Sequence, residues 1–319
     1  MIPVPKATWP LPAAAAGGSL AIFSAPILIP FVGALLALAT PVPLMLLYRR
    51  NGTAPGRQGL MWAGAGAVAL YFFTPWAGLY YFLFHLALAG VMGESAGRGL
   101  AVDRRVALAA LAGVVVSLGP LFLLASGQGG DFLEAWHQEW HQEMAAFLKA
   151  YQGGAEMDPA KLAEFQAAIG QAWEAIFRIL PALLGSTALL VCWGNFMLVR
   201  RISQMWPDPT GQWLAPLNRW RAPELLVWVV IASGGIVLFG WEGLFWWGAN
   251  FLILTGTVYF LQGMAILSYW LERKKVVRLV RVAIYTLIAV EFFLAVLIAV
   301  AGLFDVWFNF RRLDNNQPA

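Results

Sequence analysis

The chain has little charge and a single cysteine. Charged residues make up 12% of its 319 residues, whereas 60% are apolar or aromatic, and the mean hydropathy is +0.68. So few charges exclude an ordinary soluble domain, because a water-facing surface needs many more of them. The lone cysteine, Cys192, excludes a framework of disulfides. Lipid is therefore the expected solvent for most of this chain.

Sequence motifs that are typical of enzymes and of cofactor attachment are also missing. It has no Gly-x-x-x-x-Gly-Lys-Ser/Thr phosphate loop, no Gly-x-Ser-x-Gly elbow, no His-Glu-x-x-His and no Cys-x-x-Cys-His. We therefore expect neither an enzyme nor a bound cofactor. The sequence pI near 9.3 does not indicate nucleic-acid binding, because the basic residues stand at the ends of apolar runs, as topology signals do.

Long apolar runs predict the fold. A helix needs about 20 apolar residues to cross a bilayer. On this basis we expect an all-α, polytopic transmembrane helical bundle of about eight spans, with expected ranges 19–39, 59–75, 77–92, 105–126, 179–200, 224–240, 246–271 and 282–303. Four prolines in and after the first run, Pro26, Pro30, Pro41 and Pro43, predict a broken helix there.

One insert interrupts the spans. Residues 128–177 are rich in acids and read as a hairpin of two amphipathic helices, the first over about 131–151 and the second from Asp158–Pro159. The second helix has an apolar face of Leu162, Phe165, Ile169 and Trp173, so we expect the insert to rest on the bundle. It separates the N-terminal membrane helices, 1–127, from the C-terminal ones, 178–319, within one integrated membrane domain.

Charge is divided unequally between the two sides of these spans. Four segments hold 15 of the 21 basic residues and five acids, for a net charge of +10, and the opposite side has a net charge of −5. These basic segments are 49–57, 94–105, 200–224 and 272–281. The positive-inside rule makes them cytoplasmic, which predicts a multi-pass protein of the bacterial inner membrane with both termini extracytoplasmic. The pair Arg311–Arg312 is the exception to this pattern.

The strongest candidate site lies in the seventh expected span. Thr255, Tyr259 and Gln262 share one helix face, and Asn250 lies near the outer end of the same run. Glu291 is a carboxyl group in the middle of the eighth expected span, where it must pair, protonate or face water. Two readings are open: the stripe joins helices by hydrogen bonds, or it meets Glu291 and lines a cavity for a small polar or cationic solute.

Glu242 is a second candidate. It lies at the outer boundary among Trp241, Trp246 and Trp247. An aromatic box with one carboxylate can bind a cation. An interfacial belt of tryptophans explains the same residues more simply.

A tandem repeat of Trp-His-Gln-Glu places His137 and His141 one helical turn apart, with Glu134 one turn before His137. This spacing is compatible with zinc. An interfacial helix accounts for it as well, so we expect no metal.

Small residues recur every fourth position along the first segment, at Ala13, Gly17, Ala21 and Ala25. Such a stripe allows close helix contact, either inside the chain or with a membrane protein partner.

Several short segments resemble the YybS-like family of bacterial integral membrane proteins, which has no assigned activity. They are 223–228, Asn250, 259–266, 302–311 and the early Pro41-Val42-Pro43-Leu44 with Arg49, Arg50 and Gly52. That family resembles, more distantly, the S components of energy-coupling factor transporters and the scaffold protein MreD. The resemblance implies a solute-binding transporter subunit without its own ATPase, with a membrane scaffold or structural subunit as the alternative.

Overall fold

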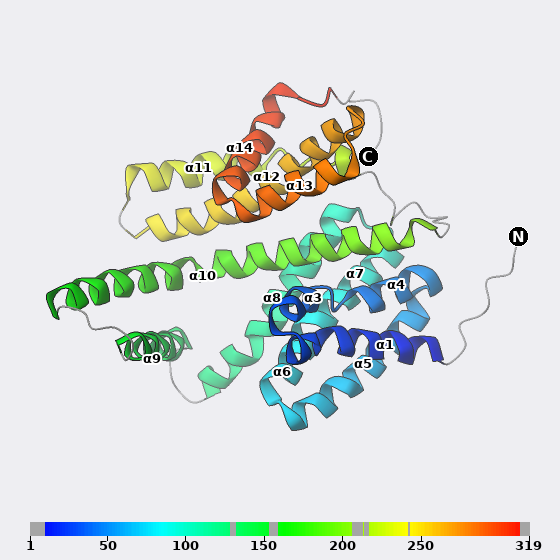
Figure 1. Cartoon of the computed structure of the whole chain (residues 1–319), viewed down its shortest axis with the longest axis horizontal. Coiled ribbons are helices and arrows are strands. Elements are labelled where there is room, and N and C mark those ends of the chain that lie inside the picture. The colour runs from blue at the N-terminus through cyan, green and yellow to red at the C-terminus, as the bar shows by residue number, and fades with distance from the viewer. Residues whose placement is uncertain are drawn as a thin grey trace, which may run out of the picture.

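The computed structural model describes residues 10–127, 132–152, 159–205, 213, 217–241 and 243–312. Every regular element in these ranges is a helix, which confirms the expected all-α membrane bundle (Figure 1). Four stretches of the described chain are long and apolar enough to cross a bilayer, or five if one bent pair is a single span. They are Pro30–Asn51, Ala77–Gly97, Glu164–Ile202 and Phe245–Arg273, with the pair Arg278–Val290 and Phe292–Phe308.

The first expected span is a helical hairpin rather than one helix. Its pieces are α1 (Pro10–Phe23), α2 (Ala25–Leu28), α3 (Pro30–Ala37) and α4 (Val42–Asn51). Proline stands at the first or second position of α2, α3 and α4, which confirms the break expected from the prolines. The Ser19 hydroxyl donates to the carbonyl of Thr40 at 2.8 Å, so the returning chain lies against α1.

The next helices form the centre of the N-terminal half. They are α5 (Thr53–Phe73), α6 (Pro75–Tyr80), the π-helical η1 (Tyr81–Leu86), α7 (Ala87–Gly97) and α8 (Val102–Gly127). The ring of Tyr48 lies between Gly56 and Gly93, where an added Cβ would come within 2.5 and 2.3 Å of it. Beside it, Arg57 forms a bidentate pair with Glu94, at 2.8 and 2.7 Å.

The predicted insert differs from the structure at its second helix. The first helix is α9 (Phe132–Gln152), close to its expected range. The second is not separate, because α10 (Pro159–Ile202) runs for 44 residues through Pro181 into the fifth expected span (Figure 1). The two helices are joined by reciprocal bonds, from the Trp140 indole to the carbonyl of Trp173 at 3.0 Å and from the Trp173 indole to the carbonyl of Trp140 at 2.8 Å.

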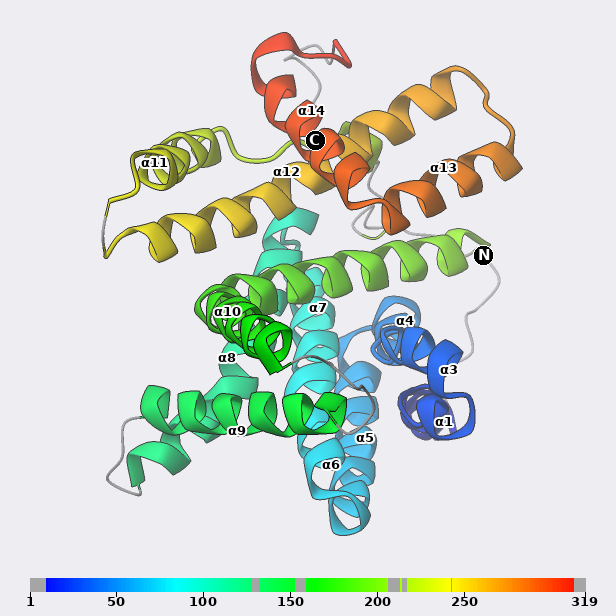
Figure 2. The same cartoon turned by 60° about the vertical axis from the view of Figure 1, so that its left-hand side comes forward.

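The C-terminal half ends in a bent pair of helices. It contains the short turns η2 (Ser203–Met205) and η3 (Leu217–Arg219), then α11 (Leu226–Phe239), α12 (Phe245–Arg273), α13 (Arg278–Val290) and α14 (Phe292–Phe308). The axes of α13 and α14 turn by 103° at Glu291 (Figure 2). The eighth expected span, 282–303, is therefore not one straight helix.

Both described ends of the chain lie beside basic segments. The carbonyl of Pro12, near the start of α1, is 3.7 Å from a Cβ built on Gly59, which follows Arg57 by two residues. Beyond α14, the Arg311 guanidinium donates to the carbonyls of Asn218 and Trp220, on either side of Arg219. The side of the bilayer that either end faces stays a prediction.

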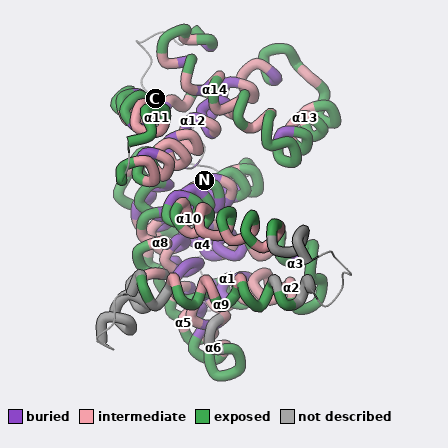
Figure 3. Tube along the Cα trace, turned by 90° about the vertical axis from the view of Figure 1, so that its left-hand side faces the viewer, coloured by how far each residue is buried: buried purple, intermediate pink, exposed green. Residues whose placement is uncertain are grey.

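Buried residues concentrate in the middle of the molecule, where α4, α8 and α10 come together (Figure 3). The outward faces of the peripheral helices are apolar and open. Phe31 in α3 is 90% exposed, and Leu238 in α11 is 85% exposed. Water would penalise such faces and lipid does not, which agrees with a helical bundle that has bilayer around it.

Candidate functional site

The predicted polar stripe of α12 points into the protein. Thr255 is 4% exposed, and Tyr259 and Gln262 are each 1% exposed. A polar side chain buried at this depth costs several kcal/mol, on the order of 2–7, unless it finds a hydrogen-bond partner. The partners of each group therefore decide what the stripe does.

Gln262 uses both ends of its amide inside the chain. Its Oε1 accepts a bond from the backbone amide of Ala222 at 2.8 Å, and its Nε2 donates to Oδ2 of Asp305 at 3.2 Å. Asp305 lies on α14 and also accepts a bond from Nη2 of Arg311 at 2.8 Å. The side chains of Asp305 and Arg311 are both fully buried. The carboxylate that faces the stripe is thus Asp305, not Glu291.

Arg311 extends this network into the segment before α11. Its Nη1 donates to the carbonyls of Asn218 and Trp220, each at 2.9 Å, while Oδ1 of Asp305 accepts from the amide of Phe310 at 2.8 Å. Burial lowers the pKa of the Arg311 guanidinium, and the neighbouring Asp305 acts in the opposite direction. The group stays cationic because arginine does not deprotonate in proteins.

The helices that carry this network cross unusually closely. A Cβ built on Gly263 would lie 2.0 Å from the carbonyl oxygen of Ile298, and one built on Gly302 would lie 2.0 Å from that of Tyr259. Only glycine fits at either position, because any side chain would push α12 and α14 apart. This crossing brings Gln262 within reach of Asp305.

Gly302→Ala should therefore destabilise the protein. We expect a loss of about 1–3 kcal/mol, since overpacking forces backbone shifts. Gly234→Ala in α11 is the matched control, because nothing lies within 4 Å of a Cβ built there. Unfolding of the purified protein in detergent measures both. Equal midpoints for the two variants would contradict the close crossing.

Asn250 does not join the Asp305 network but bonds the backbone of α10. Its Oδ1 accepts from the amide of Ala182 at 2.9 Å, and its Nδ2 donates to the carbonyl of Arg178 at 2.8 Å. Those two backbone groups are four residues apart in α10, the spacing of a helical hydrogen bond, and they flank Pro181. The amide of Asn250 therefore satisfies α10 where proline disturbs it. Nearby, the Thr257 hydroxyl bonds that of Ser186 at 2.9 Å and joins the same two helices.

The remaining candidates of the α12 site are scattered. The Thr255 hydroxyl donates back to the carbonyl of Phe251 at 2.7 Å, whereas the Tyr259 hydroxyl is buried without a partner among the described residues. Glu291 is exposed at the bend between α13 and α14. Glu242 lies outside the described residues.

The histidine candidates do come together, with one change of partner. Nε2 of His137 lies 2.9 Å from Oε2 of Glu174 on α10, and 3.1 Å from Nε2 of His141. Glu134, the acid expected from sequence, instead accepts a bond from Gln138 at 3.3 Å. Glu174 was missed because it lies 37 residues after His137, on the other arm of the hairpin.

The small-residue stripe of α1, which continues to Ala25 at the start of α2, lies mainly on the outside. Gly17 and Ala21 are exposed, and Ala13 and Ala25 are partly exposed. Nothing lies within 4 Å of a Cβ built on Gly17. The described chain therefore leaves this face of α1 largely open.

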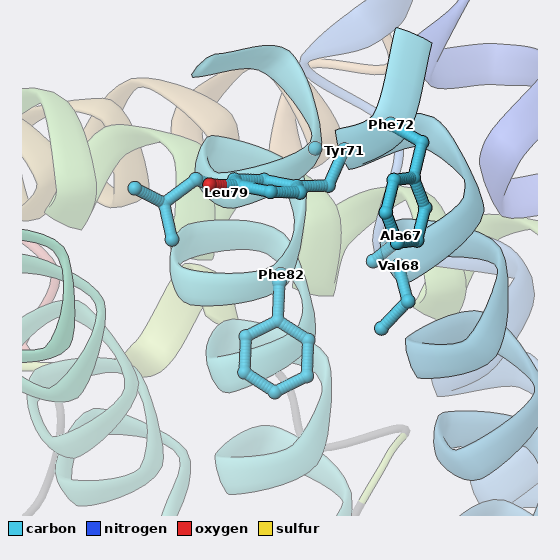
Figure 4. A pocket seen from close by; sticks show the side chains of 7 residues that line it. Ala67, Val68, Tyr71, Phe72, Leu79 and Phe82 are labelled. Atoms are coloured by element: carbon cyan, nitrogen blue, oxygen red, sulfur yellow. The ribbon is translucent and has the colours of Figure 1, made fainter. Parts of the chain in front are cut away.

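Two of the pockets formed by the described residues open on the N-terminal half, and neither of these touches the α12 stripe. One of about 200 Å³ lies between α5 and α6 and is wholly apolar, with Tyr71, Phe72 and Phe82 in its wall (Figure 4). The other, of about 580 Å³, lies between α7 and α8 and has Glu94 and Arg98 among mostly apolar residues. Their walls suit acyl chains better than a polar solute.

Helices of this length and hydropathy, with apolar outer faces and a polar stripe turned into the protein, define a multi-pass α-helical membrane protein. The sequence profile of the family described as Predicted membrane protein (DUF2232) matches residues 19–306, and the chain belongs to that family. No curated protein and no solved structure matches it. The YybS-like and S-component resemblances stay predictions.

Proposed function

We propose that this protein is a non-catalytic membrane scaffold, or structural subunit of a larger complex, that acts through helix contacts. One observation carries the proposal: the polar stripe of α12 is used to hold the protein together. The Gln262 amide bonds the backbone of Ala222 and the carboxylate of Asp305. The Asn250 amide bonds two backbone groups of α10 that flank Pro181. A solute-binding subunit would need these groups free to meet a ligand.

We further propose that the protein resides in the bacterial inner membrane with its basic end in the cytoplasm. The last turns of α4, α10 and α12 carry basic residues and lie toward one side of the molecule, whereas the hairpin of α9 and the start of α10 lies toward the other (Figure 1). The positive-inside rule supports this orientation.

The partner contact that we propose is the open face of α1, continued by Ala25 at the start of α2. Ala13, Gly17, Ala21 and Ala25 form a smooth surface on which a second transmembrane helix can approach closely. The opposite face of α1 is already used, since Ala16 and Ser19 are buried in the protein.

Purification of the chain from native membranes tests the proposal. Mass spectrometry should find a stoichiometric membrane protein and no stoichiometric small solute. Gly17→Leu should reduce recovery of the partner at least about tenfold, because roughly 1.4 kcal/mol of lost helix packing is a tenfold change in binding. Gly234→Leu, on an equally open position of α11, should leave recovery unchanged. A small molecule retained at one per chain, without a protein partner, would overturn the scaffold proposal.

Solute binding is the second candidate, and the Tyr259 hydroxyl favours it. This group is buried and has no hydrogen-bond partner among the described residues, so a ligand would satisfy it. Tyr259→Phe removes only the hydroxyl. If a co-purified solute is lost in this variant while the fold is kept, α12 binds that solute. If the variant retains the solute as the original chain does, the hydroxyl has no such role.

A further inference from the structure

We propose that His137, His141 and Glu174 form a zinc site that ties α9 to α10. This inference goes beyond the scaffold proposal and does not depend on it. Two ligands come from one face of α9 and the third from α10, so the site exists only when the hairpin is closed.

The three ligand atoms already have suitable spacing. Nε2 of His137 lies 2.9 Å from Oε2 of Glu174 and 3.1 Å from Nε2 of His141, and the remaining side of the triangle is 3.8 Å. A triangle with these sides has a circumradius of about 1.9 Å, so a point just off its plane lies about 2.0–2.1 Å from all three atoms, as Zn²⁺ requires of imidazole nitrogen and carboxylate oxygen. A metal ion can therefore enter with little movement of the side chains.

Hydrogen bonds alone do not account well for the two close contacts that Nε2 of His137 makes. An imidazole nitrogen carries either a proton or a lone pair, not both. Nε2 of His137 has two close neighbours, the carboxylate of Glu174 and Nε2 of His141. If it donates its proton to the carboxylate, it has no lone pair to accept a bond from His141. A shared cation removes this conflict, because all three atoms then direct lone pairs to one point.

The surroundings hold these ligands in position. Arg178 donates to Oε1 of Glu174 at 3.0 Å, which leaves Oε2 directed at the histidines. The reciprocal indole bonds of Trp140 and Trp173, which directly precede His141 and Glu174, join the two helices beside the cluster, with ring centroids 4.5 Å apart. Such outer contacts orient metal ligands and raise affinity.

Solvent can reach the cluster. The side chains of His137, His141 and Glu174 are 33%, 43% and 30% exposed. Two imidazoles and one carboxylate are a ligand set typical of zinc with a fourth position left for water.

Metal titration of the full-length, tag-free protein in detergent tests the inference. After chelator treatment, calorimetry should show one tight Zn²⁺ per chain. His137→Ala and Glu174→Gln should each weaken binding at least tenfold, since loss of an outer contact alone costs about 10–100-fold. Glu134→Gln is the matched control, being an acid on the same helix but outside the cluster, and it should bind as the original chain does.

X-ray absorption of the zinc-loaded original chain gives a readout that needs no variant. Two imidazole ligands and one carboxylate are expected. Binding that is equal in the original chain and in His137→Ala, or a spectrum without two imidazoles, would show that the cluster is only hydrogen-bonded and would overturn the site.

Discussion

An impermeant thiol reagent added outside intact cells should label a cysteine at position 142 and fail to label cysteines at 277 and 312. The test uses Cys192→Ser as background, although the native thiol is buried. Gln142 lies on the exposed side of α9, Val277 in the basic connection before α13, and Arg312 beyond α14, and all three are exposed. Because labelling requires access from one side, the expected contrast is nearly all or none.

The physical reason is the bend at Glu291, from which we infer that α13 and α14 form a re-entrant pair that enters and leaves the bilayer on one side. A single crossing by residues 282–303 would place Arg312 opposite Val277. Instead α14 turns by 103° at Glu291 and Arg311 bonds the segment that carries Arg219. In this arrangement Arg311 and Arg312 join the other basic segments and the charge pattern has no exception. Permeabilised cells, in which all three positions should be labelled, are the control. External labelling of position 312 but not 277 would contradict a re-entrant pair.

The sequence predicts the helices well where hydropathy alone decides. The long apolar runs of α10 and α12 were expected and are found, since such runs can satisfy their backbone in lipid only as helices. The breaks in α2, α3 and α4 were also expected, because proline lacks an amide donor. Hydropathy does not predict that α1 is a helix of its own, separate from the apolar run that follows it. Its 14 residues span only about 21 Å, which is less than the thickness of the hydrocarbon core.

Bends and pairings between distant residues were beyond such reasoning. The turn at Glu291 has no proline or glycine beside it. The apolar run on both sides of Glu291 therefore predicts one continuous helix and gives no sign of the bend. Asp305 and Arg311 are six residues apart, yet their pairing needs Asn309 in a left-handed conformation at the end of α14. The carbonyls that receive Arg311 come from residues more than 90 positions away. Patterns of local periodicity carry no information on contacts of that range.

Among the side chains of the described residues, Arg311 should be one of the most costly to remove. Arg311→Ala leaves the Asp305 carboxylate buried without its cation and frees the carbonyls of Asn218 and Trp220. Breaking a buried ion pair in this way costs about 3–5 kcal/mol, much more than an exposed pair. We expect a strongly lowered midpoint of unfolding in detergent. Arg312→Ala, at the exposed neighbouring position, should change it by no more than about 0.5 kcal/mol.

The double variant separates the ion pair from general loss of packing. With Asp305→Ala in place, Arg311→Ala no longer strands a carboxylate, so its additional cost should fall well below its cost in the original chain. Asp305→Asn should be milder than Asp305→Ala, because an amide oxygen still accepts from the backbone of Phe310. Limited proteolysis near the C-terminus should follow the same order. If Arg311→Ala is as stable as Arg312→Ala, or if the two losses simply add, then Asp305 and Arg311 do not hold α14 to the segment before α11.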